Sequence, residues 1–113
     1  MIVPKCREVW LVTFDPTVGH EQAGRRPALV VSRDEFNSSG AELVVVVPIT
    51  SKGRRLRQRI VIEPPEGGLE LKSYIIGEQP RCISLLRLER RLGTVTPATL
   101  AKTAEVVRNL LDL

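Results

Sequence analysis

Short runs of β-branched and aromatic residues, separated by turn-forming residues, make up the first two thirds of the chain. The clearest is EVWLVTF at residues 8–14. In this run Trp10, Val12 and Phe14 fall on one face of a strand, and the intervening residues fall on the other. Because both sets are mostly apolar, we expect a strand that is buried on both faces or nearly so.

Four further strands follow from the same pattern. RPALVVSR at 26–33 carries Pro27 at its start, where proline fits because it donates no hydrogen bond to a neighbouring strand. ELVVVVPIT at 42–50 is apolar almost throughout, which predicts a central strand. The other two are QRIVIEPP at 58–65 and SYIIGEQ at 73–79, while DPTVGHEQAG and DEFNSSGA are predicted to be a long loop and a turn region.

The pattern changes after the fifth predicted strand. ISLLRLERRL is typical of a short helix, and GTV predicts one more short strand. TPATLAKTAEVVRNLLDL is the clearest helix, with Thr96 as a natural N-cap and Pro97 as a natural first helical residue. Spacings of three and four residues put one apolar set on a single face of this helix: Leu100, Ala104, Val107 and Leu111.

These elements predict a mainly β protein with helices (α+β). Five or six short strands would form a small, strongly curved antiparallel sheet or a half-open barrel, capped by helices. The chain of 113 residues is long enough for one hydrophobic core, so we expect a single domain over residues 1–113.

Basic residues are in moderate excess and are unevenly placed. Lys and Arg number 17 against 13 Asp and Glu, a formal net charge of +4. SKGRRLRQR at 51–59 holds five basic residues and no acid, and RLERR at 87–91 forms a second basic group. Such stretches suit a polyanion such as nucleic acid, although they also occur as solvated loops that keep a protein soluble.

The remaining composition points to the cytoplasm and away from metals and membranes. Cys6 and Cys82 are isolated, so neither a zinc site nor a dithiol motif is expected, and both fit a reducing compartment as buried small residues. The N-terminus carries no secretory signal, and the longest apolar run is far too short to cross a bilayer. We therefore expect no membrane association, no metal and no cofactor.

Residues 20–26, HEQAGRR, offer a set of groups for RNA cleavage without a metal. A ribonuclease that uses the ribose 2′-OH as nucleophile needs a base, an acid and a cation or donor cluster. Glu21 could take or relay a proton, Arg25 and Arg26 could clamp phosphate oxygens, and His20 could titrate near neutral pH. Each also has an ordinary role: a solvated loop residue, a partner in an ion pair across the sheet, or an exposed histidine.

Thr50 ends the apolar strand 42–50 and also has two interpretations. A threonine in this place commonly hydrogen bonds to its own backbone. Its hydroxyl would also stand at the rim of the sheet, where functional sites tend to be built.

Four motifs follow one another over nearly the whole chain: VWLVTFDPTVGHEQAGRRPALVVS, VVVPITSK, SYIIGEQPR and RLGTVTPATLAKTAEVVRNLL. Together and in this order they resemble the MazF/PemK family of toxin endoribonucleases. The first motif is similar to the family's first two strands with the G-x-E-Q-x-G-x-R-P turn. VVVPITSK is similar to its third strand, SYIIGEQPR to its acidic-Gln-x-Arg segment, and RLGTVTPATLAKTAEVVRNLL to its closing helix.

The resemblance implies a compact SH3-like β-barrel, a homodimer and a cognate antitoxin whose disordered tail wraps the dimer. It also implies sequence-specific, metal-independent cleavage of single-stranded RNA, with 2′,3′-cyclic phosphate and 5′-OH products. Members usually carry a glycine where this chain has Arg7, which lies in the turn into the first strand.

The resemblance implies roles for individual residues of this chain. It implies that Arg26, the arginine of the R-P step, is a catalytic phosphate contact and the acid, with Thr50 as its partner in stabilising the transition state. It also implies a catalytic role for Glu21, the glutamate of the E-Q pair, which is implicated in activity in some members. Because the pKa of arginine is so high, we interpret Arg26 mainly as charge stabilisation and leave the proton carrier open. The expected RNA-binding residues are Arg25, Lys52, Arg54, Arg55, Gln79 and Arg81.

Two other function classes stay open on the sequence. A related barrel of the CcdB type poisons DNA gyrase without cleaving anything, but such a protein would be expected to end in an exposed Trp-Gly-type tip, and this chain ends RNLLDL. A catalytically dead RNA-binding regulator would be expected to lack the arginine or the threonine, and Arg26 and Thr50 are both present.

Overall fold

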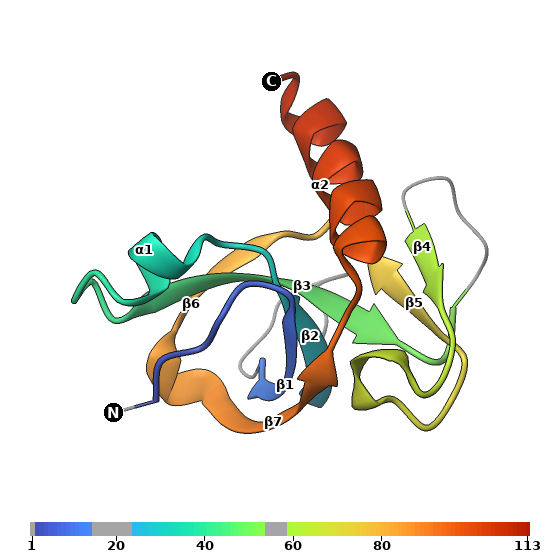
Figure 1. Cartoon of the computed structure of the whole chain (residues 1–113), viewed down its shortest axis with the longest axis horizontal. Helices are drawn as coiled ribbons and strands as arrows, with labels where there is room; N and C mark the ends of the chain where they lie inside the picture. Colours follow the sequence, from blue (N-terminus) through green and yellow to red (C-terminus); the bar gives the residue numbers. More distant parts are fainter. Residues whose placement is uncertain (1, 15–23, 54–58) are drawn as a thin grey trace.

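The computed structural model describes residues 2–14, 24–53 and 59–113 of the chain. Within these ranges one antiparallel sheet is followed by a 15-residue helix (Figure 1). Its strands run in the order β4-β5-β3-β2-β1-β7, with β6 beside β3, and the outer strands β4 and β7 do not pair, so the sheet is open rather than a closed barrel. The strands are β1 Glu8–Thr13, β2 Arg25–Val30, β3 Leu43–Thr50, β4 Arg59–Ile62, β5 Ser73–Ile76, β6 Arg81–Ser84 and β7 Leu88–Thr94; the helices are α1 Asp34–Asn37 and α2 Pro97–Leu111, with short 3₁₀ turns η1 Glu66–Gly68 and η2 Leu85–Arg87.

The middle of the sheet is buried on both faces, which confirms the prediction for residues 8–14. Trp10, Val12 and Phe14 on β1 belong to one core cluster. Val9, on the opposite face of the same strand, belongs to a second cluster with Leu29 of β2. Strand alternation therefore supplies two apolar layers from one short segment.

Strand β3 is the central strand, as its uninterrupted apolar sequence predicts. Strand β2 pairs with one edge of β3, and the other edge is shared by β6 and β5. Val46 is opposite Arg81 in β6, and Ile49 is opposite Ile75 in β5. Strands β5 and β6 thus lie end to end, and the short link between them, residues 77–80, interrupts the pairing in the middle of this edge.

The short helix predicted in residues 83–92 is wrong. Only η2 is helical there, and the flanking residues form β6 and β7. Strand β7 has two register shifts against β1, where Leu92 and Glu89 are the extra residues of β-bulges. The bulges break the alternation of apolar and polar residues that identifies a strand in a sequence. The strand forms nevertheless, because it pairs with β1, which is distant in the sequence.

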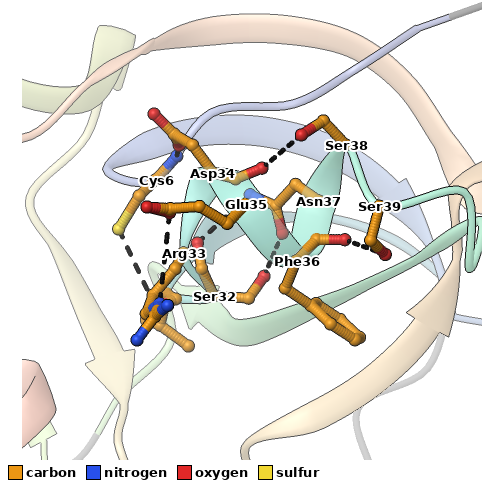
Figure 2. Close-up of polar contacts among 10 residues, drawn as sticks. Cys6, Ser32, Arg33, Asp34, Glu35, Phe36, Asn37, Ser38 and Ser39 are labelled. Atoms are coloured by element: carbon orange, nitrogen blue, oxygen red, sulfur yellow. Dashed lines mark hydrogen bonds and ion pairs between the residues drawn. The ribbon is translucent and has the colours of Figure 1, made fainter.

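The turn region predicted in residues 34–41 contains the one-turn helix α1, which polar contacts hold against the sheet (Figure 2). Asn37 is buried; it donates to the carbonyl oxygen of Ser32 at 3.1 Å and accepts from the Ser32 hydroxyl. Asp34 accepts a 2.7 Å hydrogen bond from the backbone nitrogen of Cys6. These bonds join the N-terminal segment, α1 and the end of β2.

The two cysteines occupy different environments. Cys6 is half-buried, and burial together with the nearby Asp34 carboxylate raises the pKa of its thiol. Cys82 on β6 is exposed, so the expectation that both cysteines are buried is wrong for Cys82. Its neighbours Arg81 and Ile83 point to the other face of β6, which leaves Cys82 on the solvent side.

Helix α2 begins as the sequence predicts, with Pro97 in its first turn. The Thr96 hydroxyl accepts a 3.2 Å hydrogen bond from the backbone nitrogen of Thr99. Glu66 of η1 accepts from the Thr96 nitrogen and from the Thr99 hydroxyl, which ties η1 to the helix. The predicted apolar face is buried only in part, because the far end of α2 projects from the sheet and Leu111 is 55% exposed (Figure 1). None of the helices in the described part of the chain is long and apolar enough to cross a membrane.

The turn into β1 places Arg7 in the left-handed region, with φ +78°. This is the position where the resembling family usually carries glycine, and the backbone explains why. The Arg7 nitrogen donates to the Val30 carbonyl, and its own carbonyl accepts from Val95. Its guanidinium donates to the Val95 carbonyl at 3.0 Å, so the arginine side chain adds a bond that glycine could not make.

Turn η1 and strand β7 approach each other through glycine. Gly68 has φ +70°, and a Cβ atom added there would lie 1.9 Å from the Leu92 carbonyl oxygen. A Cβ added at Gly93 would lie 2.5 Å from the Gly67 carbonyl carbon. The two backbones touch without a side chain between them, which sets the position of η1 against the sheet.

Candidate functional site

The two residues expected at the centre of the site lie at the ends of adjacent strands. Arg26, in β2, is opposite Val12 of β1. Thr50, the last residue of β3, is opposite Tyr74 of β5. Strands β2 and β3 pair through Ala28 and Pro48. Arg26 lies two residues before Ala28, and Thr50 lies two residues after Pro48. Because the strands are antiparallel, Arg26 and Thr50 are at the same rim and on the same face of the sheet.

Thr50 is 6% exposed, and its hydroxyl oxygen accepts a 3.1 Å hydrogen bond from the backbone nitrogen of Lys52. The local backbone bond that is ordinary for a strand-ending threonine is therefore present. It fixes the side chain and uses only an acceptor position of the hydroxyl, so the O–H remains available to donate. Lys52, two residues after Thr50, is exposed.

The link between β5 and β6 brings Gln79 and Arg81 to the neighbouring edge of β3. The Gln79 nitrogen donates to the Ile76 carbonyl at 3.1 Å, which closes the turn. Arg81 is opposite Val46, and its guanidinium carbon lies 5.6 Å from the centroid of the buried Phe14 ring. That cation–π contact fixes the guanidinium over the first core cluster and leaves its N–H edges for an anion.

Arg25 and Arg26 are neighbours in a strand, so their side chains leave opposite faces of the sheet. Arg25 is turned toward β7, where its Nη2 lies 2.7 Å from the Glu89 carboxylate. The Arg25 hydrogen bond lowers the pKa of Glu89, and the same bond raises the pKa of Arg25. A single phosphate clamped between the two arginines, as the sequence suggested, would need contacts from both sides of the rim.

Both arginines nevertheless border one groove, of about 510 Å³, between the sheet and η1. Arg90 and Arg91 of β7 add two more cations to its wall, and Glu70 adds one acid. The apolar residues of the lining are Leu11, Pro27, Ile49, Leu69, Leu71 and Leu92.

Glu78, which directly precedes the expected site residue Gln79, is a further carboxylate to consider. It lies in the link between β5 and β6 and pairs with Arg59 of β4 at 3.3 Å through Oε2. Its other oxygen, Oε1, is buried and has no hydrogen-bond partner in the described structure. The motif GEQPR contains Glu78 directly before Gln79, but the letters do not show that one of its oxygens is buried.

Several expected residues lie outside the described part of the chain. Glu21 and His20 belong to residues 15–23, and Arg54 and Arg55 belong to residues 54–58. The structure therefore places Arg25, Arg26, Thr50, Lys52, Gln79 and Arg81, and leaves the other roles as expectations. Among the described residues, no three His, Cys, Asp or Glu side chains form a group that could hold a metal ion.

Comparisons with known proteins show the family of the chain and agree with its fold. Residues 5–111 match the family model of the PemK-like, MazF-like toxin of type II toxin–antitoxin systems. The chain is 35% identical over 111 residues to endoribonuclease MazF9 of Mycobacterium tuberculosis, covering 94% of each chain. It superposes on the crystal structure of MazF from Deinococcus radiodurans with a TM-score of 0.88, 26% identity and full coverage of both chains. A mycobacterial endoribonuclease in complex with its cognate antitoxin shares the fold, with a TM-score of 0.77 at 24% identity over 100% of this chain and 97% of that one.

Proposed function

The chain belongs to the family of PemK-like, MazF-like toxins of type II toxin–antitoxin systems and is an endoribonuclease; on that premise we propose that it cuts single-stranded RNA at short sequence motifs without a metal ion. The ribose 2′-oxygen attacks the adjacent phosphorus, and the bond from phosphorus to the 5′-oxygen breaks. The 2′-proton goes to a base, and the departing 5′-oxygen receives a proton. The products are a 2′,3′-cyclic phosphate and a 5′-OH end.

The observation that carries the proposal is the placement of Arg26 and Thr50 at one rim of the sheet. Charge builds on the phosphate oxygens as the pentavalent transition state forms, and preorganised donors stabilise it. The Arg26 guanidinium supplies a fixed positive charge with paired donors, and the Thr50 O–H supplies a third donor. Glu21 and Glu78 are the carboxylates proposed to take the 2′-proton, Glu78 because its buried oxygen lacks a partner.

The proposed RNA contacts extend from this rim along basic and amide side chains. Arg81 is fixed above Phe14, Lys52 lies two residues after Thr50, and Gln79 carries an amide that suits base edges. Arg25, Arg54 and Arg55 are proposed as further phosphate contacts. Arg59, which the sequence analysis grouped with the basic loop, pairs with Glu78 at 3.3 Å and is therefore less available to phosphate.

Incubation with RNA and the matching DNA in the presence of EDTA tests the proposal directly. We expect RNA cuts at one short motif and intact DNA, because only RNA carries the 2′-OH nucleophile. Mapping of both ends should find the cyclic phosphate on one fragment and a free 5′-OH on the other. Cleavage that needs added Mg²⁺, or cleavage of the DNA, would contradict the proposed chemistry.

RNA binding is expected to weaken steeply with salt, because its affinity comes largely from phosphate contacts that release counterions. With about four such contacts on a single strand, the affinity should fall by about 50-fold between 50 and 200 mM NaCl. Fluorescence anisotropy with an RNA that carries a 2′-deoxy residue at the cleavage position measures binding without turnover. An affinity that stays flat over this range would exclude a phosphate-dominated interface.

We also propose the partners and the setting that the family implies. The protein acts as a homodimer of single-domain subunits, residues 1–113, in the cytoplasm, and its activity is neutralised by a cognate antitoxin. A gyrase poison or a catalytically dead regulator is not favoured, because the similar curated proteins are named endoribonucleases and Arg26 and Thr50 are both present.

A further inference from the structure

Thr13, Arg25 and Glu89 form a polar row across three neighbouring strands. Thr13 of β1 is opposite Arg25 of β2, and Glu89 comes from β7 on the other side of β1. One Glu89 oxygen accepts the Thr13 hydroxyl. The carboxylate also accepts from Arg25 Nε at 2.9 and 3.0 Å, and Arg25 Nη2 lies 2.7 Å away.

A β-bulge presents Glu89 to this row. Leu11 is opposite Arg90 and Val12 is opposite Leu88, so Glu89 is the extra residue between two paired positions. The bulge lets Leu88 enter the first core cluster while Glu89 stays on the face that carries Thr13 and Arg25. Bulges commonly re-aim a side chain beside a functional site.

The bonds to Glu89 leave one edge of the Arg25 guanidinium available. Arginine has five N–H donors, and Glu89 engages the edge formed by Nε and Nη2. The Nη1 amino group donates to no atom of the described residues. The end of the fork, made by Nη1 and Nη2, can therefore take two oxygens of a second anion, and Arg25 borders the groove of about 510 Å³.

We propose that Glu89 is a positioning residue for RNA binding: held by the bulge and by Thr13, it fixes Arg25 with its open edge toward a backbone phosphate. The inference rests on the proposed function, because the anion is a phosphate of the RNA substrate. It gives an acidic residue, bonded to an arginine that borders the groove, a part in binding a polyanion. Removing the negative charge of Glu89 should weaken RNA binding, whereas charge alone would strengthen it.

The test compares Glu89→Gln with a variant that changes the charge equally elsewhere. Glu35 on α1 pairs loosely with Arg33 at 4.0 Å, and both side chains are largely exposed, so Glu35→Gln is the matched control. Binding is measured by anisotropy with the 2′-deoxy-substituted RNA at fixed salt. We expect the Kd of Glu89→Gln to rise about three- to tenfold with kcat within about twofold, since an ordered bidentate pair is lost. Glu35→Gln should bind as tightly as the unmodified protein or slightly tighter.

Two further variants separate positioning from charge and from folding. Thr13→Val removes the hydroxyl that holds Glu89 without changing any charge, so it should also raise the Kd, by about twofold. In a protein that already carries Arg25→Ala, Glu89→Gln should have no further effect, because both act through one guanidinium. Urea midpoints of all variants identify any loss that comes from unfolding.

Three results would contradict the inference, and the third would also contradict the proposed function. If Glu89→Gln binds RNA as tightly as the unmodified protein or tighter, Glu89 is only a counter-charge and the inference is wrong. It is also wrong if Glu89→Gln weakens binding equally with and without Arg25. If the unmodified protein neither cleaves nor binds RNA in the same assays, the proposed function itself fails and the inference fails with it.

Discussion

Replacement of Arg26 by alanine is expected to reduce RNA cleavage by about a hundredfold or more, because removal of one preorganised donor from a developing oxyanion typically costs that much. The side chain stands at the rim formed by the ends of β2 and β3, on the face that it shares with Thr50. Binding of the 2′-deoxy-substituted RNA should change far less than kcat, since the contact strengthens as charge develops. Single-turnover cleavage of a short RNA at saturating protein measures the chemical step.

Matched variants make this result specific to Arg26. Arg33→Ala removes the same charge from an exposed side chain at the start of α1 and should leave cleavage unchanged. Arg26→Lys keeps the charge but loses the planar fork, so it should recover only part of the rate. Thr50→Ala should lower cleavage at least tenfold and Thr50→Ser much less, because serine keeps the hydroxyl. If neither Arg26→Ala nor Thr50→Ala lowers the rate tenfold, the site is misplaced.

Gly68→Ala is expected to destabilise the fold by about 3 kcal/mol, from a left-handed backbone and a steric clash together. Gly68 has φ +70°, and the new Cβ would lie 1.9 Å from the Leu92 carbonyl oxygen. A backbone atom cannot turn aside as a flexible side chain can, so η1 and β7 must separate. The melting temperature should fall by roughly 10 to 20 °C, measured at one fixed protein concentration.

Two other glycines allow the backbone cost and the steric clash to be measured separately. Gly40 has φ +89° with nothing within 4 Å of an added Cβ, so Gly40→Ala measures the backbone cost alone, about 1 kcal/mol. Gly93 has no positive φ but meets the Gly67 backbone at 2.5 Å, so Gly93→Ala measures the clash alone. A Gly68→Ala protein no less stable than Gly40→Ala would show that η1 and β7 do not depend on this approach. Because Gly68 borders the groove, loss of RNA binding should accompany the loss of stability.

Local patterns predicted most of the fold, and failed where distant residues decide the structure. The central strand and the cap at Thr96 are visible in a few consecutive residues, and both are found. The helix predicted in residues 83–92 was wrong because two bulges against β1 set the spacing of the apolar residues there. A pattern in consecutive residues cannot show such bulges. The apolar face predicted for α2 was too long, because Leu111 continues the helical pattern beyond the part of the helix that the sheet covers.

The positions of the candidate site residues were predictable to the extent that they follow strand order. Arg26 and Thr50 end neighbouring strands, so a sequence motif that identifies both strands also identifies the pair. Glu89 carries no such signal: its bond to Arg25 joins residues 64 positions apart, and a bulge sets its direction. The unpaired oxygen of Glu78 likewise depends on burial by the surrounding fold, which the letters GEQPR do not reveal.

The contrast between the two thiols makes the protein suitable for single-site labelling. Cys82 is exposed on β6 beside Arg81, whereas burial raises the pKa of Cys6 and so lowers its thiolate fraction at neutral pH. A maleimide fluorophore added briefly at neutral pH will therefore attach to Cys82, on the face of β6 opposite Arg81. The dye would report the arrival of RNA or of the antitoxin in real time, in a protein whose proposed catalytic residues are all unmodified.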